Sequence, residues 1–282
     1  YSQKKRGEKL KLYSLEMFPG ISVTGDWCAL KCKHCNAKFL KGMIPCTNDR
    51  ELVEIAGKIA NEGGRGILLS GGCNDKGMVP LWNVLEGVHT LKKYTALKVN
   101  AHTGLVFTRD LADLYVASGI DVFSVDVVGS KDVVREILHL GVDTSVYTKT
   151  IENLLAAGGK VVPHITIGVN YGKESGEEKS IEIVAEYSLP KVVLNVLVPV
   201  SGTALESVHV PYERIEKVFE YARGKIGGEI VLGCMRERIP DIEKLAYRCG
   251  LSGIAHPSRE FIEFIEKMGG KLEFIEGCCS LF

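Results

Sequence analysis

The sequence has no run of about 18 apolar residues, the length that a membrane-spanning helix requires. Its first residues, Tyr1 to Leu12, lack the apolar core of a secretory signal peptide. Lysine plus arginine and aspartate plus glutamate are balanced at 35 each, so net charge gives no reason to expect nucleic-acid binding. A G-x-G-x-x-G fingerprint, a nucleoside triphosphate site and a protease-like triad are also absent. These absences predict a cytoplasmic protein with no membrane partner and no nucleic-acid partner.

The sequence does contain enough hydrophobic residues for a large core, and it has an unusually large number of cysteines. It has 282 residues, of which 45% are hydrophobic and 25% charged. This length suits one large α/β domain. The nine cysteines are clustered and odd in number, and without an export signal this favours metal binding over disulfide bonds.

Short apolar runs, typical of buried parallel strands, alternate along the chain with amphipathic helical stretches. The expected strands are 20–25, 66–70, 97–100, 120–126, 161–167, 192–198, 229–233 and 253–255. Seven or eight such β–α units without a linker predict an α/β fold, a TIM-type (β/α) barrel of parallel strands that is complete or nearly complete. The alternative is a doubly wound open sheet. We expect a basic arm at 1–18, the barrel at 19–270, and a C-terminal strand with a Cys-Cys tail at 271–282.

The stretch after the first barrel strand carries the clearest chemical signal. Cys28, Cys32 and Cys35 follow a Cys-x3-Cys-x2-Cys spacing. Three thiolates from one loop can hold three irons of a cubic [4Fe–4S] cluster and leave the fourth iron open to an exchangeable ligand. A structural zinc knuckle and three unrelated core cysteines are the alternatives. Zinc would require a fourth ligand, and His34, between two of the cysteines, is poorly placed to serve.

This spacing resembles the signature of the radical S-adenosylmethionine (SAM) superfamily. The resemblance implies a [4Fe–4S] cluster whose open iron is chelated by SAM, with one-electron cleavage giving a 5′-deoxyadenosyl radical, so Cys28, Cys32 and Cys35 would be the catalytic cluster ligands. Further along, Gly71-Gly72 resembles the family's Gly-Gly-Glu-like motif for the methionine amino group, with Cys73 in place of the acid. His34 takes the position of an aromatic residue beside the adenine.

Other residues at expected strand ends complete the candidate SAM site, because chemistry in a barrel lies at the carboxyl ends of the strands. Ile165 to Gly168 resembles the family pattern that holds adenine against strand backbone, and Asn195 begins a stretch similar to the sixth strand and loop of biotin synthase. Asn100, His102 and Asp126 are candidates for binding ribose or substrate. A structural role is the alternative for each of these three.

Six further cysteines need an explanation. We expect Cys249 to be a core residue. The other five could hold a second iron–sulfur cluster, with small core side chains as the alternative; they are Cys46, Cys73, Cys234, Cys278 and Cys279. Cys73 is also a candidate cluster or substrate ligand beside the first site. Arg236 falls near the place where biotin synthase has an arginine ligand, but the third, fourth and fifth strands carry no cysteine.

Taken together, the chain resembles a biotin synthase homologue with relocated sulfur-site cysteines. One component of the archaeal-type two-protein lipoyl synthase fits that description. This resemblance implies sulfur insertion into an octanoyl chain on a carrier protein or lipoyl domain, a second radical SAM component as partner, and an electron donor such as ferredoxin. The alternatives are a radical SAM enzyme of cofactor biosynthesis without sulfur transfer, acting by rearrangement or carbon–carbon bond formation, and a non-catalytic iron–sulfur scaffold subunit.

Overall fold

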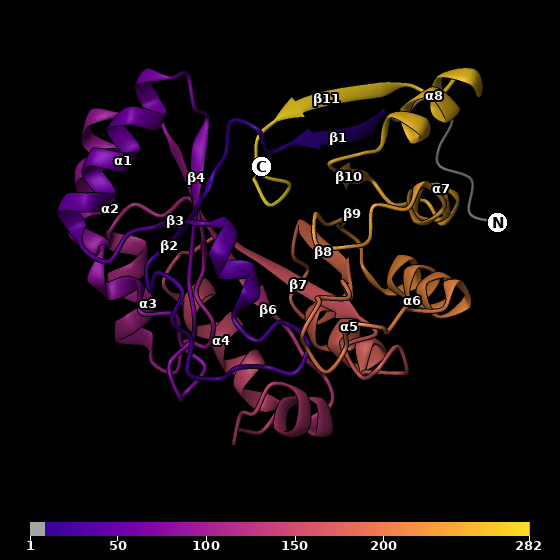
Figure 1. Cartoon of the computed structure of the whole chain (residues 1–282), viewed down its shortest axis with the longest axis horizontal. Helices are drawn as coiled ribbons and strands as arrows, with labels where there is room; N and C mark the ends of the chain where they lie inside the picture. The colour runs from indigo at the N-terminus through magenta and orange to yellow at the C-terminus, as the bar shows by residue number, and fades with distance from the viewer. Residues whose placement is uncertain (1–8, 282) are drawn as a thin grey trace.

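A computed structural model describes residues 9–281, which build one sheet of parallel strands flanked by helices (Figure 1). The eleven strands lie in the order β11-β1-β10-β9-β8-β7-β6-β5-β4-β2-β3. Their bounds are β1 (Leu10–Ser14), β2 (Gly20–Ser22), β3 (Ile44–Pro45), β4 (Gly66–Ser70), β5 (Lys98–His102), β6 (Val122–Asp126), β7 (Val161–Ile167), β8 (Lys191–Val196), β9 (Glu229–Leu232), β10 (Gly253–Ala255) and β11 (Leu272–Glu276).

Helices connect successive strands, and side-chain caps mark where three of them begin. The side chains of Asn48, Thr108 and Ser258 each accept a hydrogen bond from the backbone three residues on. The α-helices are α1 (Asp49–Asn61), α2 (Leu85–Tyr94), α3 (Arg109–Ala117), α4 (Ser145–Ala156), α5 (Glu177–Ala185), α6 (Tyr212–Lys225), α7 (Pro240–Arg248) and α8 (Arg259–Lys267). Three short helices accompany them, η1 (Lys38–Gly42), η2 (Leu81–Asn83) and η3 (Val133–Ile137), the last a π-helix. None of the described helices is both long and apolar enough to cross a membrane.

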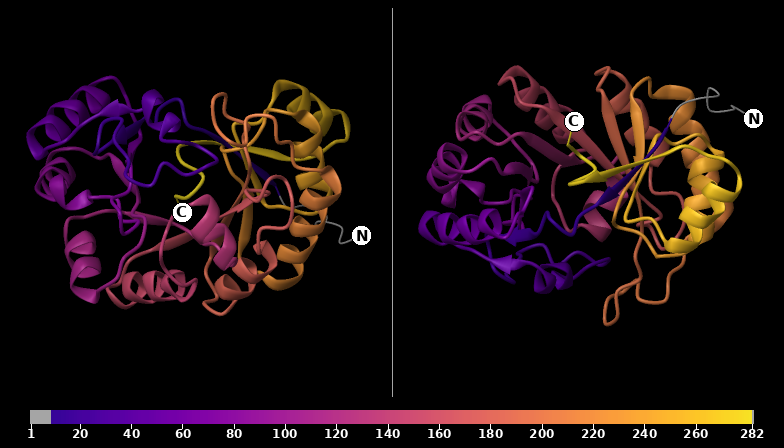
Figure 2. Two further views of the ribbon diagram at one scale, coloured as in Figure 1. Left: turned by 60° about the horizontal axis from the view of Figure 1, so that its bottom comes forward. Right: turned by 90° about the horizontal axis from the view of Figure 1, so that it is seen from above.

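The sheet curls so that the helices surround its outer face, as Figure 2 shows. Alternate side chains on each strand face the helices or the concave inner side, which we call the lumen. Val122, Val162, Val193 and Val231 form the apolar part of the lumen. The parallel α/β barrel predicted from the sequence is confirmed in this curled form. Within the described residues, edge strands β3 and β11 pair with one neighbour each, so the sheet remains open.

The N-terminal segment differs from the sequence prediction. Leu10–Ser14 forms β1 between β10 and β11, and the side chains of Leu10 and Leu12 are buried. The interpretation of 1–18 as a basic arm is therefore wrong for this strand, while Lys4, Lys5 and Arg6 lie outside the described residues. The alternation of leucine and lysine marks a strand whose leucines are buried on one face. On the other face Tyr13 is also buried, and Lys11 forms an ion pair with Glu229.

The C-terminal tail turns back into the lumen after β11, at Gly277. Figure 2 shows the C-terminus in the middle of the ring of helices. Cys278, Cys279 and Ser280 are buried there. Lys191 holds the tail by donating to the carbonyl of Leu281. The tail thus forms an internal plug whose two thiols lie inside the molecule.

Candidate functional site

The cysteine loop lies between β2 and η1, and neighbouring loops hold it in place. The amide of Ala29 donates to the carbonyl of Cys73 at 2.8 Å, and the amide of Lys33 to that of Ile137 at 2.9 Å. Lys31 takes a positive φ of 46°, which turns the chain tightly between the first and second cysteines. Cys28, Cys32 and Cys35 are all free thiols. The loop therefore presents three soft metal ligands on a backbone fixed at both ends.

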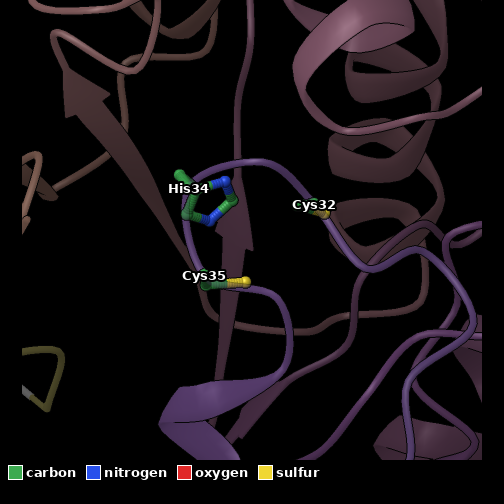
Figure 3. Close-up of side chains that lie close together, drawn as sticks. All are labelled: Cys32, His34 and Cys35. Atoms are coloured by element: carbon green, nitrogen blue, oxygen red, sulfur yellow. The ribbon is translucent and has the colours of Figure 1, made fainter. Parts of the chain in front are cut away.

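Two of these thiols and a histidine meet closely (Figure 3). Ligand atoms of Cys32, His34 and Cys35 all lie within 4.8 Å of one another. Hydrogen bonding with the Cys32 thiol is the main cause that lowers the pKa of Cys35, and the same bond raises the pKa of Cys32. The expectation that His34 is poorly placed to serve as a zinc ligand is wrong, because a turn in which the amide of Cys35 donates to the carbonyl of Cys32 at 3.2 Å brings the imidazole next to both thiols. The short distances among Cys32, His34 and Cys35 therefore fit a zinc site as well as an iron–sulfur cluster.

Gly72 packs directly against the backbone of the cysteine loop, which leaves no room for a side chain. A Cβ atom there would be 1.9 Å from the carbonyl oxygen of Trp27 and 2.6 Å from the Cα of Cys28. The amide of Gly72 donates to Thr24 Oγ1 at 2.7 Å. Cys73 follows directly, and burial together with the nearby Cys28 raises the pKa of its thiol to about 12. The Gly71-Gly72 pair predicted to contact methionine therefore supports the cluster loop, and Cys73 lies beside the first three cysteines.

A cavity of about 130 Å³ opens next to the loop. Its lining includes His34, Asp126, His164, Ile165 and Thr166, so it reaches from the cysteine loop to the carboxyl end of β7. His34 Nδ1 is buried and has no hydrogen-bond partner among residues 9–281. Three residues predicted for the nucleotide, His34, Asp126 and Ile165, thus share one cavity, with an unsatisfied polar atom close by.

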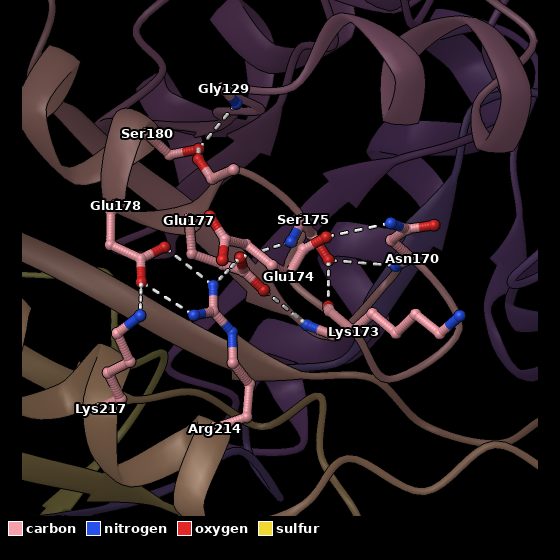
Figure 4. A network of polar contacts seen from close by, with 12 residues as sticks. Gly129, Asn170, Lys173, Glu174, Ser175, Glu177, Glu178, Ser180, Arg214 and Lys217 are labelled. Atoms are coloured by element: carbon pink, nitrogen blue, oxygen red, sulfur yellow. Dashed lines mark hydrogen bonds and ion pairs between the residues drawn. The ribbon is translucent and has the colours of Figure 1, made fainter.

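Gly168 does not line this cavity. Its amide joins a polar network in which Glu177, Glu178 and Arg214 take part (Figure 4). Its amide donates to Glu177 Oε1 at 2.9 Å, and the amide of Ser175 donates to Glu177 Oε2 at 2.7 Å. Arg214 donates to Glu177 and, at 2.8 Å, to both carboxylate oxygens of Glu178. Glu177 is buried, so its charge depends on this arginine. The network fixes the loop after β7, where the sequence predicts adenine binding.

A family model described as the radical SAM superfamily matches residues 22–186, more than half of the chain. The chain belongs to the radical SAM superfamily. The matched region contains the three cysteines, the cavity and most of the polar network. A comparison with curated protein sequences finds no match.

Several solved structures share this fold at low identity. Methylornithine synthase (PylB) matches with a TM-score of 0.64 and 16% identity, covering 95% of this chain and 85% of that one. The hydrogenase maturase HydG matches with a TM-score of 0.66 and 14% identity over 88% of this chain and 57% of HydG. SuiB of Streptococcus suis bound to S-adenosylmethionine matches with a TM-score of 0.52 and 16% identity over 96% and 51%. At these identities the matches show the fold alone.

The donor set fits the [4Fe–4S] cluster and SAM that the superfamily uses. Three free thiols on one fixed loop leave one iron open, and the adjoining cavity carries an unpartnered ring nitrogen of His34. Cys28, Cys32 and Cys35 would hold the cluster, and the cavity would receive the nucleoside. When bound, the cluster and SAM supply a strong one-electron reductant and a carbon radical. The protein's own part is to position the loop, exclude water and shape the cavity.

The other residues predicted for the site lie on the lumen side of the strands. Asn195 is buried, and its Oδ1 has no hydrogen-bond partner within the described part of the chain. Asn100 is fully buried and donates from Nδ2 to the thiol of Cys278 at 3.2 Å, which places it below the cavity with the tail. His102 and Asp126 lie close to His164, and the three offer ligand atoms within 4.8 Å of one another.

Sequence reasoning missed His164. It lies on β7 between Val162 and Thr166, and the alternation of the strand places all three on the lumen side. Its ring stands edge-on to that of His102 with centroids 4.8 Å apart. Burial lowers the pKa of both imidazoles, so both are neutral near pH 7. The strand period could have revealed it, since a polar residue at a lumen position of a barrel is a candidate site residue.

The five spare cysteines divide into three groups. Cys234, Cys278 and Cys279 lie on the lumen side of the sheet, where Cys278 raises the pKa of Cys234 and a hydrogen bond between the tail thiols lowers the pKa of Cys278 and raises that of Cys279. Cys73 belongs to the first site. Cys46 is fully buried in the main core, and its thiol donates to the carbonyl of Asn48 at 3.5 Å. The structure thus does not bring Cys46 or Cys73 to the lumen thiols.

The guanidinium of Arg236 is bound by backbone carbonyls and by Glu243. Its guanidinium donates to the carbonyl oxygens of Gly233 and Ala255 at 2.6 and 2.7 Å and forms an ion pair with Glu243. Both side chains of the pair are fully buried. The placement of Arg236 as a counterpart of the biotin synthase ligand is therefore not supported by these contacts, which give it a structural role between β9, β10 and α7.

Proposed function

We propose that this chain is a radical SAM enzyme that abstracts hydrogen from an unactivated carbon and inserts sulfur from a second iron–sulfur cluster. The observation that carries the proposal is the common location of Cys234, Cys278 and Cys279 in the lumen. Thiols in such a group are the usual ligands of iron–sulfur clusters. They lie in the same lumen as the cavity beside the radical site, so a substrate carbon could face both.

The tail thiols are held in position by side chains. Asn100 donates to Cys278, and the Ser124 hydroxyl donates to Asn100 Oδ1 at 2.9 Å. A hydrogen bond to a sulfur stabilises its thiolate form, which is the form that binds iron. Asn100 therefore acts in the proposal as a positioning residue for the second cluster. This role differs from the contact to SAM or substrate expected from the sequence.

The substrate in this proposal is an octanoyl chain on a lysine of a carrier protein or lipoyl domain, as in lipoyl synthesis. Support comes from the resemblance of the chain to one component of a two-protein lipoyl synthase. A second radical SAM component and an electron donor such as ferredoxin complete the proposal.

The test is the iron and sulfide content per chain after anaerobic reconstitution. About eight irons in the wild type, falling to about four in either a Cys28/Cys32/Cys35→Ala or a Cys278/Cys279→Ala variant, would support two [4Fe–4S] clusters. Cys46→Ala is the matched control, because that buried thiol lies in the main core, and it should leave the iron content unchanged. About four irons in the wild type, retained in Cys278/Cys279→Ala, would refute sulfur insertion and favour a radical enzyme without sulfur transfer.

Substrate identity is tested separately. The reconstituted chain is incubated with SAM, a reductant and an octanoylated lipoyl domain, with and without a second radical SAM component. Gain of sulfur on the domain, read by mass spectrometry, supports the lipoyl assignment. Production of 5′-deoxyadenosine without any sulfur gain would contradict it, and failure to cleave SAM at all would indicate a scaffold subunit.

A further inference from the structure

Three side chains at the carboxyl ends of neighbouring strands converge in the lumen. His102 ends β5, Asp126 ends β6, and His164 lies on β7 directly opposite Asp126 in the strand register. Each offers one ligand atom, and all of these atoms lie within 4.8 Å of one another. Adjacent parallel strands fix these positions by their backbone pairing, so the group is held by the most rigid part of the molecule.

The contacts of this group leave its ligand atoms unused. Among residues 9–281, neither the imidazole of His102 nor the carboxylate of Asp126 makes a hydrogen bond or ion pair. His164 makes one hydrogen bond, between Nε2 and Ser280 Oγ at 3.1 Å, which leaves Nδ1 available. These three side chains therefore present ligand atoms to one another at the carboxyl ends of adjacent strands, which is the arrangement that a bound cation requires.

We propose that His102, Asp126 and His164 bind a single divalent transition-metal ion, separate from the iron–sulfur cluster of the cysteine loop. Two imidazoles and one carboxylate form a well-known donor set for such ions and leave coordination positions open for a substrate group. Ligand atoms within 4.8 Å of one another need only small side-chain rotations to reach a common ion. The carboxylate of Asp126 is exposed at the mouth of the lumen, so the open positions face the cavity.

The C-terminal tail supplies a hydrogen bond to one of the proposed metal ligands. Ser280 Oγ bonds to His164 Nε2 and also lies 3.2 Å from Ser124 Oγ. Outer hydrogen bonds of this kind fix the ring orientation of a metal-binding histidine. The metal would act as a Lewis acid that holds a polar group of the substrate next to the radical site. This inference goes beyond the proposed sulfur insertion and does not require it.

The test uses Mn²⁺ as the probe, because oxygen and nitrogen ligands suit this ion while thiolates select softer ones, so the nine cysteines interfere least. The anaerobic protein with its cluster is titrated with Mn²⁺, and the free ion is measured by its electron paramagnetic resonance signal. We expect one saturable site per chain. Asp126→Asn and His164→Ala should weaken binding at least tenfold, and Ser280→Ala should weaken it severalfold.

His89→Ala is the matched control, since this histidine is exposed on α2, and its binding should equal that of the wild type. Asp126→Asn decides the test, because Asp126 is exposed and its substitution leaves the packing intact; unchanged iron content and circular dichroism verify the fold of each variant. The absence of saturable Mn²⁺ binding in the wild type, or binding by Asp126→Asn equal to that of the wild type, would overturn the proposal.

Discussion

Replacing Gly72 with alanine should disable the radical site, although glycine to alanine adds only one methyl group. The added Cβ would be 1.9 Å from the Trp27 carbonyl oxygen and 2.6 Å from the Cα of Cys28, whereas ordinary contacts begin near 3.4 Å. Both obstacles are backbone atoms of the cysteine loop, so no rotation of a side chain relieves the clash. The loop would have to move by more than about 1 Å, and misplacement of this size costs on the order of 100-fold in rate.

The assay is reductive cleavage of SAM to 5′-deoxyadenosine, together with iron content after reconstitution. Gly72→Ala should lower the cleavage rate about 100-fold or more. Gly71→Ala is the matched control, because its Cβ would meet Thr24 Oγ1 at 3.1 Å and Val23 Cγ2 at 3.2 Å, where side chains can adjust. That variant should stay within a few-fold of the wild type. Wild-type iron content and cleavage in Gly72→Ala would refute the argument that this contact positions the loop.

Two further predictions concern stability. Arg236→Ala leaves the fully buried Glu243 without its partner, so the free energy of unfolding measured in urea should fall by about 3 to 5 kcal/mol. Arg50→Ala removes an exposed ion pair with Glu54 and should change this free energy little. Equal effects of the two substitutions would contradict the structural role of Arg236. Arg214 lowers the pKa of Glu178 from 4.5 to about 2, so this carboxylate stabilises the fold above pH 4.5 and loses its contribution as the pH falls toward 2. Wild type and Glu178→Gln should therefore differ in unfolding free energy by at most about 2 kcal/mol after solvent screening, and this difference should shrink as the pH falls over that range. A difference that does not change with pH would show that the charge of Glu178 does not cause the stabilisation.

Strand and helix positions followed closely from local patterns. Val161–Ile167 has the bounds that the sequence predicts, because a continuous apolar run marks a buried parallel strand. The pattern failed at Leu10–Ser14, where lysines between the leucines suggested a solvated arm. Burial of that strand depends on pairing with β10 and β11 from the far end of the chain, and local sequence carries no record of such a partner.

The candidate site also has one part that local sequence predicts and another part that only the fold reveals. The spacing of Cys28, Cys32 and Cys35 identifies the radical SAM loop without any structure, because three ligands within eight residues are close wherever the loop folds. The spare cysteines are far apart along the chain, and only the fold shows that Cys234 and the tail thiols meet while Cys46 lies in the core and Cys73 beside the first site.

The sequence by itself therefore determined the alternation of strands and helices, the family and the first cluster site, all of which depend on contacts between near neighbours in the chain. Tertiary structure alone decided that the tail enters the lumen, that His164 joins His102 and Asp126, and that Arg236 is bound to Glu243. These arrangements join residues up to 178 positions apart, and closing such long loops is set by the whole packed core rather than by any local pattern.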